Sequence, residues 1–102
     1  MLMTAAPATA LDKAYPGFWA PEKEACDPGD RTAFMITPKG FSGPENVCET
    51  KEERREHGGW RLRFYCAQEG YEFWLIVHWH LQRDGRLRET MKGHPRECVR
   101  CG

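Results

Sequence analysis

The residues between 71 and 82 form the feature that most constrains the fold. The stretch YEFWLIVHWHLQ carries apolar side chains at every odd position from 73 to 81, whereas its even positions end in His78, His80 and Gln82. Successive side chains of a strand point to opposite faces, so one face of this segment is continuously apolar. We therefore predict a long strand whose odd positions face a core and whose histidines face away from it.

The segment before it, residues 60–67, carries its apolar side chains at even positions. A two-residue turn at Glu69-Gly70 would place both apolar sets on one face and would set Trp60 opposite Trp79. A three-residue turn would instead direct arginines toward the core. Because a shift of one residue turns every side chain to the other face, the pattern predicts an antiparallel hairpin with the shorter turn.

The following hairpin is predicted by the same reasoning. A three-residue loop over 83–85, with its glycine in the left-handed conformation, continues the apolar face into residues 86–91. This register sets Glu89 opposite Trp79 on the inner face. We expect the inward carboxylate to pair with an arginine such as Arg61 and to have a structural role.

Glycine and proline recur at short intervals along the chain, which is typical of all-β sandwiches and barrels. The polar stretch ETKEERREH is interpreted as a strand end or an exposed loop. We predict one all-β domain over residues 17–102, a small antiparallel up-and-down barrel or strongly curved sheet of about six to eight strands. The candidate strand segments are 17–20, 32–37, 46–52, 60–67, 71–82 and 86–91.

Five cysteines are many for a cytosolic chain of 102 residues, and they indicate a disulfide-stapled domain in an oxidising compartment. Residues 1–16 are interpreted as a signal-peptide remnant or a disordered extension, since Ala8-Thr9-Ala10 resembles a signal cleavage site. No apolar run reaches the length of about 18 residues that a membrane span requires. We therefore expect a periplasmic or secreted protein.

Strand register suggests how the cysteines pair. If the strand around Cys48 lies beside the strand around Cys66, the connection is centred near residue 57, next to two glycines, and a bridge between the two is sterically reasonable. Cys26 would then join the C-terminal tail through Cys98 or Cys101. We prefer Cys101, which leaves Cys98 as the free thiol.

A metal or redox site is the alternative to this arrangement. His78 and His80 project from the same face of a strand, and Cys98-x-x-Cys101 has a spacing that suits the other half of a tetrahedral zinc site. The simpler explanation is that the outward face of any strand carries polar residues because it is in contact with water. We predict such a face, with no metal and no cofactor, and keep the zinc-binding or redox protein as the second hypothesis.

Charge and motifs narrow the classes of function. The 15 basic and 15 acidic residues balance, whereas a general nucleic-acid binder needs a basic excess, so no nucleic-acid partner is expected. The chain contains no Gly-rich phosphate loop, no nucleophile elbow and no HExxH motif. We predict a non-enzymatic binding protein whose partner is a small apolar ligand or another protein, such as an envelope hydrolase that it would inhibit.

The binding site is expected at the rim or on the outer surface, because Trp60, Phe64, Phe73 and Trp79 would fill so small a barrel. The stretch TPKGFSGPEN is the candidate binding loop, and Trp74 is the candidate exposed aromatic anchor. The candidate binding residues are Lys39, Phe41, Ser42, Glu45 and Trp74.

The order of motifs from residue 17 to 101 resembles that of a group of short exported bacterial proteins. The shared elements are a glycine-tryptophan start in GFWA, the G-x-E-x-x-C pattern of GPENVC, the W-x-L-x-x-x-C pattern of WRLRFYC, and D-G-x-L in DGRL. The resemblance implies a small periplasmic β-barrel. Periplasmic inhibitors of lysozyme and of proteases are similar in size and also disulfide-stapled, and this likeness concerns the fold.

Overall fold

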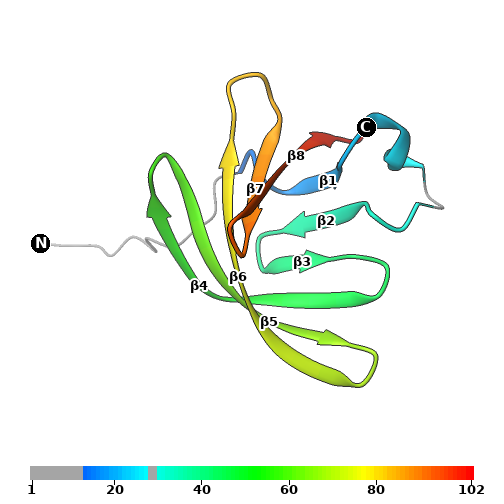
Figure 1. Cartoon of the computed structure of the whole chain (residues 1–102), viewed down its shortest axis with the longest axis vertical. Helices are drawn as coiled ribbons and strands as arrows, with labels where there is room; N and C mark the ends of the chain where they lie inside the picture. Colours follow the sequence, from blue (N-terminus) through cyan, green and yellow to red (C-terminus); the bar gives the residue numbers. More distant parts are fainter. Residues whose placement is uncertain (1–12, 28–29) are drawn as a thin grey trace, which may run out of the picture.

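The computed structural model describes residues 13–27 and 30–102, and over these residues the chain is all-β (Figure 1). The described residues contain eight strands and one short 3₁₀ helix. In chain order they are β1 (Gly17–Ala20), η1 (Lys23–Cys26), β2 (Phe34–Thr37), β3 (Gly40–Ser42), β4 (Asn46–Glu56), β5 (Gly59–Gln68), β6 (Tyr71–Leu81), β7 (Leu87–Met91) and β8 (His94–Arg100).

Each strand pairs antiparallel with the next one along the chain, and β8 returns to β1, so the sheet is a closed barrel. The closing seam is short and consists of the pairs Trp19–Arg100 and Ala20–Val99. A closed barrel leaves no row of unpaired backbone groups at a sheet edge. The predicted up-and-down barrel is therefore confirmed.

The predicted registers of the two central hairpins are confirmed. Trp60 lies opposite Trp79 across β5 and β6, and Trp79 lies opposite Glu89 across β6 and β7. The tight turn between β5 and β6 has Glu69 and Gly70 at φ values of 42° and 92°, the left-handed conformation that two-residue hairpin turns require. In the loop of residues 83–85, Gly85 has a φ of 90°, as predicted.

Strand β4 is longer than predicted, because the polar residues 53–56 continue it as far as the turn. The register shifts between Thr50 and Glu52, where β4 holds one extra residue, a β-bulge. After the bulge, Glu56 pairs with Gly59, so the turn is His57-Gly58 and is not centred on His57 as the uninterrupted register predicted.

Two strands, β3 and β8, were not predicted from the sequence. Strand β3 has three residues and lies within the stretch that was predicted to be a binding loop. Its first residue approaches β4 very closely: a Cβ on Gly40 would lie 1.9 Å from the carbonyl oxygen of Cys48. Only glycine permits this approach, so the close packing of β3 on β4 depends on Gly40.

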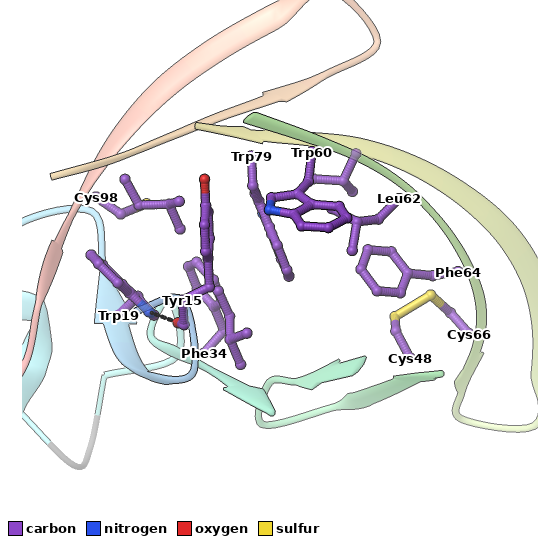
Figure 2. Packing of buried hydrophobic residues seen from close by; sticks show 13 residues of the cluster. Tyr15, Trp19, Phe34, Cys48, Trp60, Leu62, Phe64, Cys66, Trp79 and Cys98 are labelled. Carbon is purple, nitrogen blue, oxygen red and sulfur yellow. Dashed lines mark hydrogen bonds between the residues drawn. A yellow bond between two sulfur atoms is a disulfide. The ribbon is translucent and has the colours of Figure 1, made fainter. Parts of the chain in front are cut away.

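The barrel interior holds one apolar cluster that includes Trp19, Phe64, Leu62, Val77 and Trp79. In Figure 2 the contact between Tyr15 and Trp19 lies on one side of the cluster and the Cys48–Cys66 disulfide lies on the other. Together with Trp60, these large side chains fill much of the interior, as expected.

The N-terminal boundary of the domain needs a correction. Tyr15 was assigned to a segment outside the barrel, but it is buried in the core, and its hydroxyl oxygen accepts a hydrogen bond from the backbone N–H of Leu81 (3.0 Å). The barrel domain therefore includes Tyr15. The proposed signal cleavage site at residues 8–10 lies outside the described residues.

The disulfides join Cys26 to Cys101 and Cys48 to Cys66, the predicted pairs. Cys48 and Cys66 face each other across β4 and β5 inside the barrel. The other bridge ties η1 to the residue that follows β8 by one position, and η1 lies near the C-terminus in Figure 1. Two bridges of this kind persist in an oxidising environment.

Cys98 is the free cysteine, buried on the inner face of β8 opposite Leu87. Burial raises the pKa of its thiol to about 11, so the reactive thiolate is scarce at neutral pH. We expect the folded protein to be almost inert to a thiol reagent at pH 8, and the chain unfolded in guanidinium to release one equivalent. Rapid labelling of the folded protein would contradict the buried position.

Candidate binding site at the mouth of the barrel

The predicted binding loop is not one loop. Lys39 lies in the turn before β3. Glu45 is exposed in the turn after β3 and forms an ion pair with Arg31, which precedes β2. Phe41 turns inward from β3 and packs edge-on against the ring of Phe64, with ring centroids 4.8 Å apart. Ser42 ends the strand half-buried. Lys39, Phe41 and Ser42 line one hollow beside β3 and β4, and Glu45 does not line it. Binding by these residues stays a prediction.

Trp74 lies on the outer face of β6, as predicted, and its side chain is 52% exposed. The guanidinium of Arg63 lies 4.1 Å from the centroid of the indole ring. The ring of Tyr65 packs beside the indole, with ring centroids 4.8 Å apart. Ile76, the next outward residue of β6, is also exposed. Trp74, Ile76, Arg63 and Lys92 line a shallow groove on this outer face, and none of its lining residues is a carboxylate.

The residues of the alternative metal site do not meet. His78 and His80 are exposed on the outer face of β6, opposite Thr90 and Arg88. Cys101 is bonded to Cys26, and Cys98 faces the barrel interior. Across residues 13–27 and 30–102, no three His, Cys, Asp or Glu side chains are arranged to hold a metal ion. His78 and His80 therefore lie on an exposed strand face, as predicted.

We expect replacement of both histidines, His78→Gln with His80→Gln, to change the free energy of unfolding by no more than about 0.5 kcal/mol per site. Neither substitution removes core area, and glutamine keeps hydrogen-bonding capacity. Thermal melts of both proteins, with and without EDTA, provide the measurement. If the chelator lowers the melting temperature of the wild type, and the double variant is strongly destabilised, a metal stabilises the fold.

The inner face of β6 is fully buried only around Val77 and Trp79. On the inner face of β6, Val77 and Trp79 are buried, whereas Phe73 and Leu75 near the start of the strand are only half-buried. Tyr15 contacts Leu81 at the opposite end of the same strand. Phe73, predicted to fill the core, therefore lies at an opening.

We call this opening the mouth of the barrel, a hollow of about 330 Å³. It lies where β2, β4, β6 and β8 begin and β7 ends, so short segments that are distant in sequence converge on it. Its walls are mostly apolar, and its floor contains an ion pair. The wall residues are Phe34, Phe41, Phe73, Leu75 and Met91, and the floor residues are Glu89 and Arg96.

Glu89 is 2% exposed, and both of its carboxylate oxygens accept hydrogen bonds. The indole Nε1–H of Trp79 donates to Oε2 (2.8 Å), and the Nε–H of Arg96 donates to Oε1 (2.8 Å). The prediction that Glu89 pairs with Arg61 is wrong. Arg61 lies opposite His78 in the sheet and points to the same outer face as that histidine. A buried carboxylate needs such partners, since an unpaired buried charge is strongly destabilising.

The side chain of Arg96 is 39% exposed, so its guanidinium reaches from the buried carboxylate toward the solvent. It lies 5.3 Å from the ring centroid of Phe34, which holds the guanidinium plane against the wall of the mouth. No described residue accepts a hydrogen bond from its terminal Nη1 or Nη2 groups. The floor of the mouth therefore presents hydrogen-bond donors to whatever enters.

Part of this site is predictable from the sequence. The alternation in 71–82 and the register placed Phe73, Leu75 and Glu89 on the inner face, but Arg96 was missed because β8 was missed. The signal available was the inward Glu89 itself, which required a cation from an unassigned segment.

Comparisons with protein-family models, with curated proteins and with solved structures give no match for this chain. No helix within the described residues is long and apolar enough to cross a membrane. The function must therefore be inferred from the geometry of the barrel itself.

Proposed function

We propose that this protein is a non-enzymatic, exported binding protein whose barrel mouth holds a small apolar ligand. One observation carries the proposal: apolar side chains that face the interior of the barrel, Phe73 and Leu75 among them, are only half-buried and line a hollow where several strands begin. Small-molecule sites are concave and mostly apolar, with a few polar groups that orient the ligand, and they occur in the mouths of β-barrels.

The size of the mouth limits the ligand. A volume of about 330 Å³ lies at the lower end of the range of about 300–1,000 Å³ that ligand pockets span. Trp79 and Phe64 occupy the interior beneath it, so a ligand cannot penetrate far. The proposed ligand is therefore one compact molecule and not a long acyl chain.

The two disulfides support export to the periplasm or to the extracellular medium, because such bridges are rare in cytosolic proteins. The motif order from GFWA to the last cysteines supports the same compartment through its resemblance to short exported bacterial proteins. Binding in that compartment would not depend on a cytosolic cofactor.

We expect a compact neutral aromatic compound such as 2-acetylnaphthalene to bind saturably and to shift the indole N–H resonance of Trp79, which lies under the mouth. The indole resonance of Trp74, on the outer face, should not shift. Leu75→Trp, which narrows the mouth, should weaken binding by about tenfold or more, equal to about 1.4 kcal/mol.

Ile76→Trp is the matched control, since Ile76 neighbours Leu75 but points to the outer face. It should leave binding unchanged. Equal losses in the two variants, or shifts confined to Trp74, would place binding on the outer face and contradict the proposal.

A protein partner is the second candidate, favoured by the exposed pair Trp74 and Ile76 on the outer face. Among the described residues that line their groove, Arg63 and Lys92 are cationic and none is a carboxylate. Arg63 is paired with Glu52 (3.2 Å), so Lys92 is the cation that best suits an acidic protein surface. A secreted or periplasmic hydrolase with an acidic rim to its active-site cleft is the partner we propose, and inhibition would be the consequence. Loss of hydrolase binding in Trp74→Ala, with the Leu75→Trp variant still binding, would support it.

A further inference from the structure

We infer that the ligand of the mouth is a neutral molecule with a compact apolar body and one hydrogen-bond acceptor, such as a ketone, ester or amide carbonyl. This inference rests on the proposed function of the mouth and concerns the class of ligand. Three properties of the described residues lead to it: the hydrogen-bond groups left open on the floor, the balance of charge, and the shape of the walls.

The floor offers donors and no strong free acceptor. Both oxygens of Glu89 are engaged, one by Trp79 and one by Arg96. The side-chain oxygen of Asn46, at the rim, already accepts a hydrogen bond from the backbone N–H of Gly43 (3.1 Å). The terminal N–H groups of Arg96 remain, so the complementary polar group of a ligand is an acceptor.

The charge of the mouth is balanced before any ligand enters. The carboxylate of Glu89 compensates the guanidinium of Arg96 on the floor, and Glu45 compensates Arg31 at the rim. An anionic ligand on Arg96 would share one guanidinium with Glu89 and place two negative charges close together in a partly dry site. A cationic ligand would meet the guanidinium directly. A neutral acceptor has neither cost.

The walls favour a flat, compact body. Phe34 and Phe41 are arranged edge to face, with centroids 6.2 Å apart, and both line the mouth together with Phe73. The guanidinium lies over Phe34, so a carbonyl that meets Arg96 brings the rest of its molecule against these rings. Aromatic rings pack well against such edges and faces.

Three naphthalenes of matched shape test the class of ligand by calorimetric titration of the intact, oxidised protein. They are 2-acetylnaphthalene, which has a neutral acceptor, 2-ethylnaphthalene, which has none, and 2-naphthoate, which is anionic. We expect 2-acetylnaphthalene to bind about tenfold more tightly than each of the other two, because a hydrogen bond to a charged group contributes about that much.

Two variants assign the preference to the floor. In Arg96→Lys the ion pair with Glu89 can persist, but the guanidinium N–H groups that remain for a ligand are lost. The affinity of 2-acetylnaphthalene should therefore fall to that of 2-ethylnaphthalene. In Glu89→Gln the floor gains a net positive charge while the shape is kept, so 2-naphthoate should bind about tenfold more tightly than it binds to the wild type. Far-UV circular dichroism checks that each variant is folded.

The outcomes separate this inference from the proposed function. Equal affinities of the acetyl and ethyl compounds, or tightest binding of 2-naphthoate to the wild type, would overturn the class of ligand while leaving the mouth as the site. Failure of all three compounds to bind at millimolar concentration would overturn the proposed function, and this inference with it. An unchanged 2-naphthoate affinity in folded Glu89→Gln would overturn the argument from charge.

Discussion

Removal of the Cys26–Cys101 disulfide is expected to lower the free energy of unfolding by about 4 kcal/mol. The bridge joins residues separated by 75 positions, so reduction frees a very large loop of the unfolded chain. The bridge also holds η1 against the end of the chain, beside a barrel seam of only two residue pairs. Urea unfolding of the double variant Cys26→Ser with Cys101→Ser measures the loss.

The Cys48–Cys66 disulfide is the internal comparison. Its sequence separation is 18, which corresponds to about 3 kcal/mol in the same chain-entropy treatment. Cys48→Ser and Cys66→Ser should each destabilise the fold by comparable amounts, and the double variant should cost little more than either one, because both remove the same bond. Additive losses, or a Cys26–Cys101 variant as stable as the wild type, would contradict this assignment.

The second large effect is expected from Glu89→Ala, which should lower the free energy of unfolding by about 3–5 kcal/mol. The substitution leaves the indole N–H of Trp79 without its acceptor inside the barrel and the guanidinium of Arg96 without its counter-ion. The indole N–H stays buried without a partner, whereas the Arg96 side chain, 39% exposed, loses its counter-ion but remains in contact with solvent. Equilibrium unfolding in guanidinium chloride gives the magnitude.

A paired replacement tests the reason for this loss. Glu89→Met combined with Arg96→Met removes both charges together, and this double variant should be more stable than Glu89→Ala alone, since methionine refills the space of Glu89 and no cation is left without its partner. Arg61→Met removes an outward arginine from the same barrel and should cost no more than about 0.5 kcal/mol. A double variant less stable than Glu89→Ala would mean that the pair itself supplies the stability.

Local rules explain how much of the fold was predictable. The alternation in residues 60–67 and 71–82 specifies which face is buried, and only one turn length brings the two apolar faces together. The glycines at positions 70 and 85 take the left-handed conformations that such turns need. The same register argument located Cys48 opposite Cys66, even though it turned Val47 outward, and Val47 is indeed exposed.

The sequence by itself therefore determined the two central hairpins, the inward position of Glu89, the Cys48–Cys66 pair and the outward position of Trp74. Each of these follows from contacts between segments that are close in sequence or from a period of two residues. The bulge in β4 was not predictable, because one extra residue among polar neighbours leaves no apolar pattern to interrupt.

Only the tertiary structure decided where the proposed binding site lies. Strand β8 carries Arg96 on its inner face, and an arginine at an inward position interrupts the apolar pattern that identifies a strand. The position is compatible with a strand only because Glu89, seven residues earlier, neutralises the arginine. Strand β3 is held by its neighbours and by the close approach at Gly40 and has too few residues to show a period. Phe73 and Leu75 have the same inward pattern as Val77 and Trp79, and they line a mouth because the barrel ends beside them. Where a barrel ends is set by the closure of all its strands together, and no single strand encodes it.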